Sequence, residues 1–273
     1  MFEQKYSITI RTVGLKKAEA AAYEIGVRRN LHLILATTSG HILLNSIHYN
    51  AVKLRANVIL EPQNGTCDAG LKRPVFVHDR FAGVVFGFSP EDYSDSGECG
   101  QLILKQGQNG ARLPNEVLFH ELVHVMRLLS HHGIGAPKLS GGLYKYDDFE
   151  EFCAILATNV YISDGTNRLK SGLRRDHASA TVLEPELSGS FTFFQSGENI
   201  FYWVQRFCNE NVGFTRGLAG VKTDFNPIAA YYENPAKASE MSLTPLAQER
   251  DSKGFRQEAD KYHLAKVHTP QAP

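Results

Sequence analysis

The sequence lacks several features that would assign it to a well-defined class of protein. Its 273 residues include 29 basic and 29 acidic side chains, so the formal net charge is zero. No excess of positive charge therefore favours a nucleic-acid or membrane-surface partner. No apolar run reaches the ~18 residues that a membrane-spanning helix requires. We therefore expect neither a nucleic-acid partner nor a membrane span.

The chain also lacks an ordinary signal peptide and a cysteine framework. Residues 1–6 contain no basic segment followed by an apolar core. The 4 cysteines are widely spaced and include no Cys-x-x-Cys pair, so they predict neither a zinc knuckle nor a dense set of disulfides. Cys67 and Cys99 lie in glycine-rich polar stretches and would pair in an oxidising compartment; two reduced thiols are the simpler expectation.

The most informative stretch that is present, residues 120–124, has the sequence His-Glu-Leu-Val-His. Apolar residues recur around it at helical spacing and Pro114 precedes it, so we expect a helix. Residues four apart share a helix face, so His120 and His124 can offer two imidazole nitrogens to one metal ion. Glu121 lies one step round the helix, where it can take a proton from water that the metal activates. The alternative is an amphipathic helix that carries these residues by chance, but burying three ionisable groups without partners is costly.

A catalytic zinc site needs a third protein ligand and an open position for water. His131 is a weak candidate, because a continuous helix would carry it about 10 Å beyond His124. In zincins of the glutamate class, the third ligand is a Glu on a second helix that packs against the first. A small residue three positions later lets the two helices approach. Glu151 with Ala154 fits that pattern and is favoured over its neighbour Glu150. The other interpretation is that both are solvated acids at the start of a helix.

The strands and helices expected along the rest of the chain predict an α+β fold. Short strands before a His-Glu-x-x-His helix suit a small mixed or antiparallel sheet, whose edge strand pairs with extended substrate. The sequence does not indicate which strand is that edge. Residues 31–35 fit either a short strand or the end of the preceding helix. Strands are expected at residues 6–10, 56–60, 74–78, 84–88 and 101–104, and further helices at 16–29, 41–47, 149–161 and 200–208.

We expect residues 1–273 to form a single domain, with a core at about residues 30–180. A helical, aromatic-rich extension is expected at residues 190–273. Its last ~30 residues are charged and are expected to fray.

The chain contains four motifs: Thr-x-x-Gly-x-x-Leu-Leu at 37–44, His-Glu-x-x-His at 120–124, Glu-Glu-Phe-x-Ala-x-Leu-x-Thr-Asn-x-Tyr at 150–161 and Arg-Arg-Asp-His at 174–177. Together they resemble those of the NleD-like effector zinc metallopeptidases. The resemblance covers about residues 30–180. A looser likeness, carried by Phe-Glu-Glu at residues 149–151, is to clostridial neurotoxin light chains, which use the second Glu on zinc.

The resemblance implies a zincin-like fold of the gluzincin type, in which the His-Glu-x-x-His helix packs on a second ligand-bearing helix. It also implies a bacterial effector or toxin, delivered by type III secretion or as a domain on type VI spike proteins of the VgrG kind. Such a protein would cleave a protein of a target cell, in a host cytosol or a competitor periplasm, and would have a secretion-system partner. The expected cofactor is Zn2+.

The expected chemistry is peptide-bond hydrolysis, with zinc held by His120, His124 and Glu151 and with Glu121 as the general base. The oxyanion that forms needs a further donor. The alternative function is a zincin-like module for binding or secretion assembly with little proteolysis, against which the intact Glu121 argues. Asp176 is a candidate to orient a ligand histidine. The candidate oxyanion donors are Arg174, Arg175, His177 and Tyr161.

Overall fold

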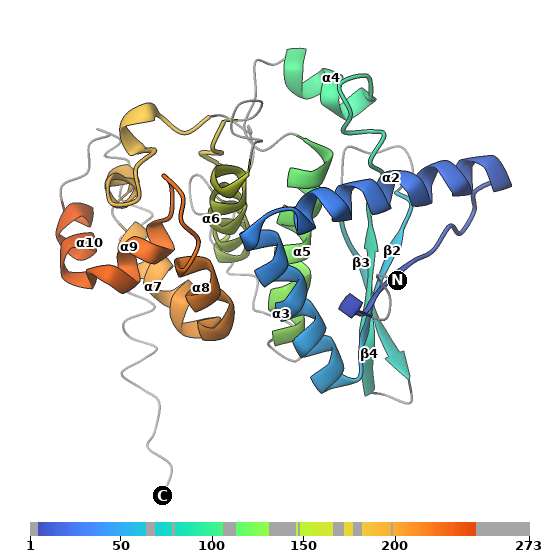
Figure 1. Ribbon diagram of the computed structural model, residues 1–273, viewed down its shortest axis with the longest axis horizontal. Coiled ribbons are helices and arrows are strands. Elements are labelled where there is room, and N and C mark those ends of the chain that lie inside the picture. Colours follow the sequence, from blue (N-terminus) through green and yellow to red (C-terminus); the bar gives the residue numbers. More distant parts are fainter. Residues whose placement is uncertain are drawn as a thin grey trace, which may run out of the picture.

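The computed structural model describes most of the chain up to residue 243. Within the described residues the protein is α+β, with a small mixed sheet at one side and the C-terminal helices at the other (Figure 1). No described helix is both long and apolar enough to cross a membrane. The described residues are 5–63, 69–77, 80–105, 113–130, 146, 148–165, 172–176, 182–197 and 199–243.

The described residues form one sheet of four strands, and the antiparallel strand lies at one edge of it. The strands are β1 (Ile8–Ile10), β2 (Asn57–Glu61), β3 (Gly70–Val77) and β4 (Arg80–Gly87), in the order β1-β2-β4-β3. β1, β2 and β4 are parallel, and β3 runs antiparallel to β4. Pro74 lies within β3, which suits an edge strand because proline cannot donate to a second neighbour. The predicted small mixed sheet is thus confirmed.

The two helices between β1 and β2 explain one of the sequence motifs. α2 (Lys17–Leu35) ends just before α3 (Thr38–Leu54), so residues 31–35 continue a helix rather than form a strand. Thr37 caps α3 by accepting a hydrogen bond from the Gly40 N–H at 3.0 Å. A Cβ atom on Gly40 would lie 1.8 Å from the carbonyl oxygen of Ile34. The Thr-x-x-Gly motif therefore makes a tight helix-to-helix turn.

The strand expected at residues 101–104 is wrong, because these residues belong to helix α4 (Glu98–Lys105). A short apolar run does not distinguish a strand from a helix. The carbonyl oxygen of Asp92 accepts the N–H groups of Cys99 and Gly100 at 2.9 and 3.0 Å, which fixes the chain in a turn that leads into the helix. Local hydrogen bonds thus favour the helix here.

The two central helices lie between the sheet and the C-terminal helices (Figure 1). α5 (Pro114–Ser130) packs against α2, α3, β3 and α6 (Phe149–Asp164), and α6 packs in turn against α7. The helix expected at residues 200–208 is confirmed as α7. The C-terminal part consists of η2 (Pro185–Leu187), η3 (Thr192–Ser196), α7 (Ile200–Glu210), α8 (Val212–Ala219), α9 (Pro227–Glu233) and α10 (Pro235–Ser242).

One cysteine does not have the reduced thiol that we expected from the sequence. Cys99 is disulfide-bonded, so it is not the reduced thiol that the sequence favoured. Cys153 and Cys208 are free and buried. Cys67, the partner considered for Cys99, is not among the described residues, and the pairing of the two stays a prediction.

Candidate metal centre

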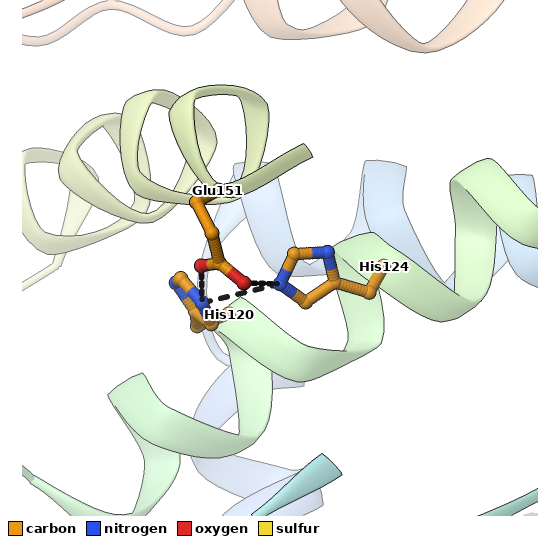
Figure 2. A group of neighbouring side chains, drawn as sticks. All are labelled: His120, His124 and Glu151. Carbon is orange, nitrogen blue, oxygen red and sulfur yellow. Dashed lines mark hydrogen bonds and ion pairs between the residues drawn. The ribbon is translucent and has the colours of Figure 1, made fainter. Parts of the chain in front are cut away.

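Three residues from two helices converge at the contact between α5 and α6. The side chain of Glu151 reaches from α6 toward His120 and His124 on α5 (Figure 2). One ligand atom from each of these residues lies within 4.8 Å of the others, and the group can hold a metal ion. His120 is 3% exposed, so the group lies largely below the surface. Within the described residues it is the only group of at least three His, Cys, Asp or Glu side chains with this geometry.

Local sequence explains why the two helices present these side chains. His120 and His124 are four residues apart, so they share one face of α5 while apolar residues cover the others. Asp148 caps α6 by accepting a hydrogen bond from the Glu151 N–H at 2.9 Å, which fixes the first turn of the helix. Ala154 is fully buried one turn beyond Glu151, where its small side chain lets α6 approach α5 closely.

The distances within the group fit a tetrahedral metal site. His120 Nε2 lies 3.1 Å from Glu151 Oε2 and 3.3 Å from His124 Nε2. His124 Nε2 lies 3.4 Å from Glu151 Oε1. Tetrahedral zinc with bonds of ~2.0–2.1 Å separates its ligand atoms by about 3.3 Å. The two histidine nitrogens are therefore already spaced as two ligands of such an ion would be, and each lies close to a different carboxylate oxygen of Glu151.

The protonation of the group follows from burial and close contact. Burial lowers the pKa of His120 to about 3. Burial also lowers the pKa of His124, but the hydrogen bond to Glu151 and the charges of nearby carboxylates outweigh it and raise that pKa to about 9. Burial disfavours the charged form of Glu151, yet its bonds to the two histidines hold its pKa well below the usual range. Without a metal, His124 is thus protonated and Glu151 ionised at neutral pH.

Glu150, the other candidate ligand, is directed elsewhere. Its two carboxylate oxygens accept hydrogen bonds from Arg127 Nε at 2.8 Å and from Arg127 Nη2 at 2.7 Å. It is absent from the group of possible metal ligands, which contains Glu151 instead. Both acids are therefore engaged by side chains of α5, and neither is simply a solvated residue at the start of a helix. His131, the weaker candidate, belongs to a part of the chain that the structure does not describe.

Glu121 lies beside the start of the edge strand. A Cβ atom on Gly70, the first residue of β3, would lie 3.8 Å from Glu121 Oε2. The Glu121 side chain is half-buried, and its charge contributes to the raised pKa of His124. The carboxylate is thus close both to the histidine pair and to a strand backbone without a side chain.

Two further residues considered as catalytic have different outcomes. Tyr161 lies in the core, stacked on Phe119 with ring centroids 4.3 Å apart, and its hydroxyl accepts a hydrogen bond from Asn115 Nδ2 at 2.6 Å. It follows Glu151 by ten positions on α6, which corresponds to about 15 Å along the helix axis. The structure therefore does not bring Tyr161 to the metal group. His177 is outside the described residues, and its role stays a prediction.

Of the two arginines considered as oxyanion donors, Arg174 is the one whose charge acts on the metal group. Its positive charge contributes to the lowered pKa of His120. Asn159 on α6 holds the Arg174 backbone with two hydrogen bonds of 2.7 Å. Arg175 Nη1 lies 2.8 Å from Glu184 Oε1, and its Nε lies 3.4 Å from Asp176 Oδ2. The expectation that Asp176 orients a ligand histidine stays a prediction.

Sequence reasoning missed Arg127 and Gly70. Arg127 lies three residues past His124, among the apolar residues of the His-Glu-x-x-His helix. A charged residue in such a position is rarely buried without a partner, and this could have identified Arg127 from the sequence. Gly70 carries no local signal, because only the sheet topology brings it to Glu121. Comparison of the chain with protein-family models, curated proteins and solved structures gives no match.

Proposed function

We propose that the protein is a zinc-dependent endopeptidase of the gluzincin type. The observation that carries this proposal is the group of His120, His124 and Glu151, with Glu121 next to His120 in sequence: the two Nε2 atoms lie 3.3 Å apart, and each lies 3.1 or 3.4 Å from one of the Glu151 oxygens. Two neutral imidazoles and one carboxylate form a donor set that suits zinc and leaves a fourth position open. The resemblance to NleD-like effector peptidases supports the same assignment independently of the distances.

The proposed division of labour follows the chemistry of each group. His120, His124 and Glu151 would hold the zinc, which when bound acidifies water and polarises a carbonyl group. Glu121 accepts a proton from the attacking water and then gives it to the nitrogen of the departing amine, so that the protons balance over the cycle. This proton transfer requires a carboxylate beside the metal group that is not itself a ligand, and Glu121 meets that description.

Arg174 is the proposed donor to the oxyanion. The developing negative charge needs a positive partner fixed in advance, and Arg174 acts electrostatically on His120. The two hydrogen bonds between Asn159 and the Arg174 backbone would hold it in place. Arg175 is a weaker choice because its guanidinium is paired with Glu184.

The proposed substrate is a protein or peptide bound in extended form along β3. β3 is an edge strand, so one side of its backbone has no partner within the described sheet. Its first residue, Gly70, lies beside Glu121, so a peptide added there would run past the proposed base. Action in a target cell after delivery by a secretion system rests on the resemblance alone. The disulfide at Cys99 is compatible with passage through an oxidising compartment.

Cleavage of a proteome-derived peptide library, with new termini identified by mass spectrometry, tests the peptidase. We expect cleavage by the zinc-loaded wild type, loss of cleavage with a chelator, and loss in Glu121→Gln with zinc retained. Zinc binding without cleavage that depends on Glu121 would favour a binding or assembly module instead. Expression of the wild type and of Glu121→Gln in recipient cells tests the effector role, because a toxic peptidase loses toxicity with that single change.

A further inference from the structure

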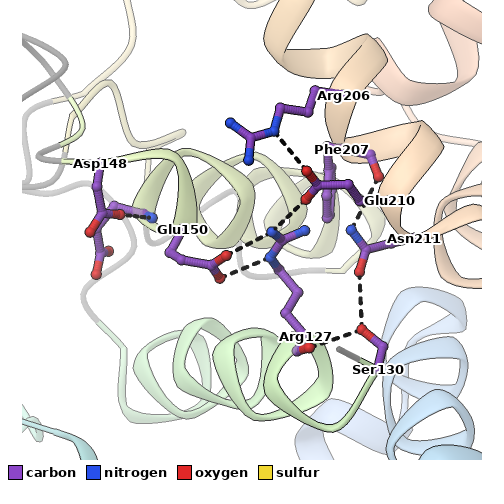
Figure 3. A network of polar contacts seen from close by, with 9 residues as sticks. Arg127, Ser130, Asp148, Glu150, Arg206, Phe207, Glu210 and Asn211 are labelled. Carbon is purple, nitrogen blue, oxygen red and sulfur yellow. Dashed lines mark hydrogen bonds and ion pairs between the residues drawn. The ribbon is translucent and has the colours of Figure 1, made fainter. Parts of the chain in front are cut away.

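A buried arginine ties the metal group to the C-terminal helices. Arg127 lies on α5 three residues beyond His124, and its side chain is 2% exposed. It donates to both carboxylate oxygens of Glu150 at 2.7 and 2.8 Å, and its Nη2 also lies 3.0 Å from Glu210 Oε2 on α7 (Figure 3). One guanidinium thus joins three helices.

The surroundings of Arg127 keep its guanidinium in one position. Phe149 and Phe207 contribute aromatic rings whose centroids lie 5.2 and 5.5 Å from its Cζ atom. A paired Arg–carboxylate fork is planar and directional, unlike the point charge of a lysine. Removing one partner of such a buried pair leaves an uncompensated charge, so the arrangement is costly to disturb. The contact between α5 and α6 is therefore fixed at Arg127.

This fixed contact bears directly on the ligand Glu151. Adjacent residues on a helix point about 100° apart. The contact between Arg127 and Glu150 fixes the rotation of α6 about its own axis. Glu151 is then directed at His120 and His124, which lie on α5 together with Arg127. The fork also occupies Glu150, the adjacent carboxylate on α6 that could compete with Glu151 for the metal.

Contacts with α7 extend the arrangement into the C-terminal part. Glu210 accepts a hydrogen bond from Arg206 Nε at 2.7 Å, which orients it toward Arg127. Arg206 in turn lies over the ring of Phe149 at 4.0 Å, at the start of α6. Trp203 packs on the same ring with centroids 5.6 Å apart. α7 is thus seated on the first turn of α6, next to the ligand.

We propose that Arg127 is a positioning residue for the metal site and that, through Glu210, it makes metal affinity depend on helix α7. The proposal rests on the metal-binding part of the proposed function but not on proteolysis. Groups that orient metal ligands from outside typically contribute 10–100-fold to metal affinity. Arg127 acts on the ligand through Glu150, so its effect requires that carboxylate.

The test is the zinc dissociation constant of the full chain, measured by competition with a chromophoric chelator. We expect Arg127→Lys to weaken zinc binding about tenfold or more, because lysine cannot form the planar fork. Glu210→Gln should weaken it several-fold. Glu210 is 27% exposed and lies on another helix, so this variant is expected to fold even where a change at Arg127 does not. At saturating zinc both variants should still bind one ion.

Two comparisons separate positioning from a general loss of packing. Arg28 on α2 donates from Nε and Nη2 to one carboxylate oxygen of Glu24, at 2.9 and 2.7 Å, on a helix that carries no metal ligand, so Arg28→Lys should leave zinc affinity unchanged. In a Glu150→Gln background, Arg127→Lys should have a much smaller effect than in the wild type.

Zinc affinity within twofold of wild type in Glu210→Gln and Arg127→Lys would overturn the proposal, as would an equal effect of Arg127→Lys in both backgrounds. Absence of peptide cleavage in a chain that shows the expected affinities would remove the peptidase and leave the positioning role standing.

Discussion

Gly70 and Glu121 lie so close that a Cβ atom on Gly70 would be 3.8 Å from the Glu121 carboxylate. They belong to different layers, since Gly70 begins the edge strand β3 and Glu121 lies on α5. A methyl group would make only ordinary contact there, whereas a branched side chain would fill the space beside the proposed base. The absence of a side chain at Gly70 therefore leaves space beside the Glu121 carboxylate, where the proposed substrate would lie.

Gly70→Leu is expected to reduce cleavage of a peptide substrate more than tenfold while zinc content stays at the wild-type level, and Gly70→Ala should have a smaller effect. The matched control is Gly213→Leu, because a Cβ atom on Gly213 meets nothing within 4 Å. Equal cleavage rates in Gly70→Leu and in wild type would show that β3 does not border the reacting groups.

Zinc binding is expected to release one proton per ion at neutral pH. Burial keeps His120 neutral, with a pKa of about 3, so it has no proton to lose. In His124, burial is outweighed by the bond to Glu151, and the pKa of about 9 means that a proton must leave before a metal binds. The zinc dissociation constant should therefore fall about tenfold per pH unit between about pH 6 and 8. A pH dependence that corresponds to the release of two protons per zinc ion, or of none, would contradict the assignment of one bound proton to His124.

Tyr161→Phe is expected to affect stability rather than turnover. The change leaves the Nδ2 donor of Asn115, a residue only 3% exposed, without the hydroxyl that accepts from it. Losing that acceptor should lower the free energy of unfolding by about 1–3 kcal/mol, measured by urea denaturation. Cleavage by the folded variant should stay within about twofold of wild type. Loss of turnover at undiminished stability would return Tyr161 to the list of catalytic residues.

Gly40→Ala tests whether the Thr-x-x-Gly motif is structural. The added Cβ atom would lie 1.8 Å from the carbonyl oxygen of Ile34, a backbone atom that cannot move without shifting α2. Overpacking of this kind should cost about 3 kcal/mol or more of unfolding free energy. Gly213→Ala, also in a helix, should instead be neutral or stabilise by about 0.5–1 kcal/mol. Equal urea midpoints for the two variants would contradict the steric account.

The parts of the site that the sequence predicted are those set by local geometry. His120 and His124 share a helix face because of their spacing, so their proximity follows from the helix itself. Glu151 was favoured over Glu150 because Ala154 follows it three residues later, and the structure places Glu151, not Glu150, in the group with the two histidines. The cap that Asp148 provides is equally local.

The parts that the sequence did not predict depend on contacts between distant segments. Pro74 is compatible with an edge position for β3, but no local pattern in residues 70–77 predicts that β3 pairs antiparallel with β4 in the order β1-β2-β4-β3. The pairing of Arg127 with Glu210 spans 83 residues and depends on how α7 docks. Tyr161 was one of several candidate oxyanion donors, but ten residues of helix separate it from Glu151, which corresponds to about 15 Å along the axis of α6.

The most direct test of the account is the zinc content of purified protein, measured by elemental analysis in wild type, Glu151→Gln and Glu150→Gln. We predict about one zinc ion per chain in the wild type, near zero in Glu151→Gln, and about one in Glu150→Gln at saturating zinc, since only Glu151 lies within reach of both histidines. A wild-type chain without zinc, or a Glu151→Gln chain that retains it, would contradict the proposed metal centre.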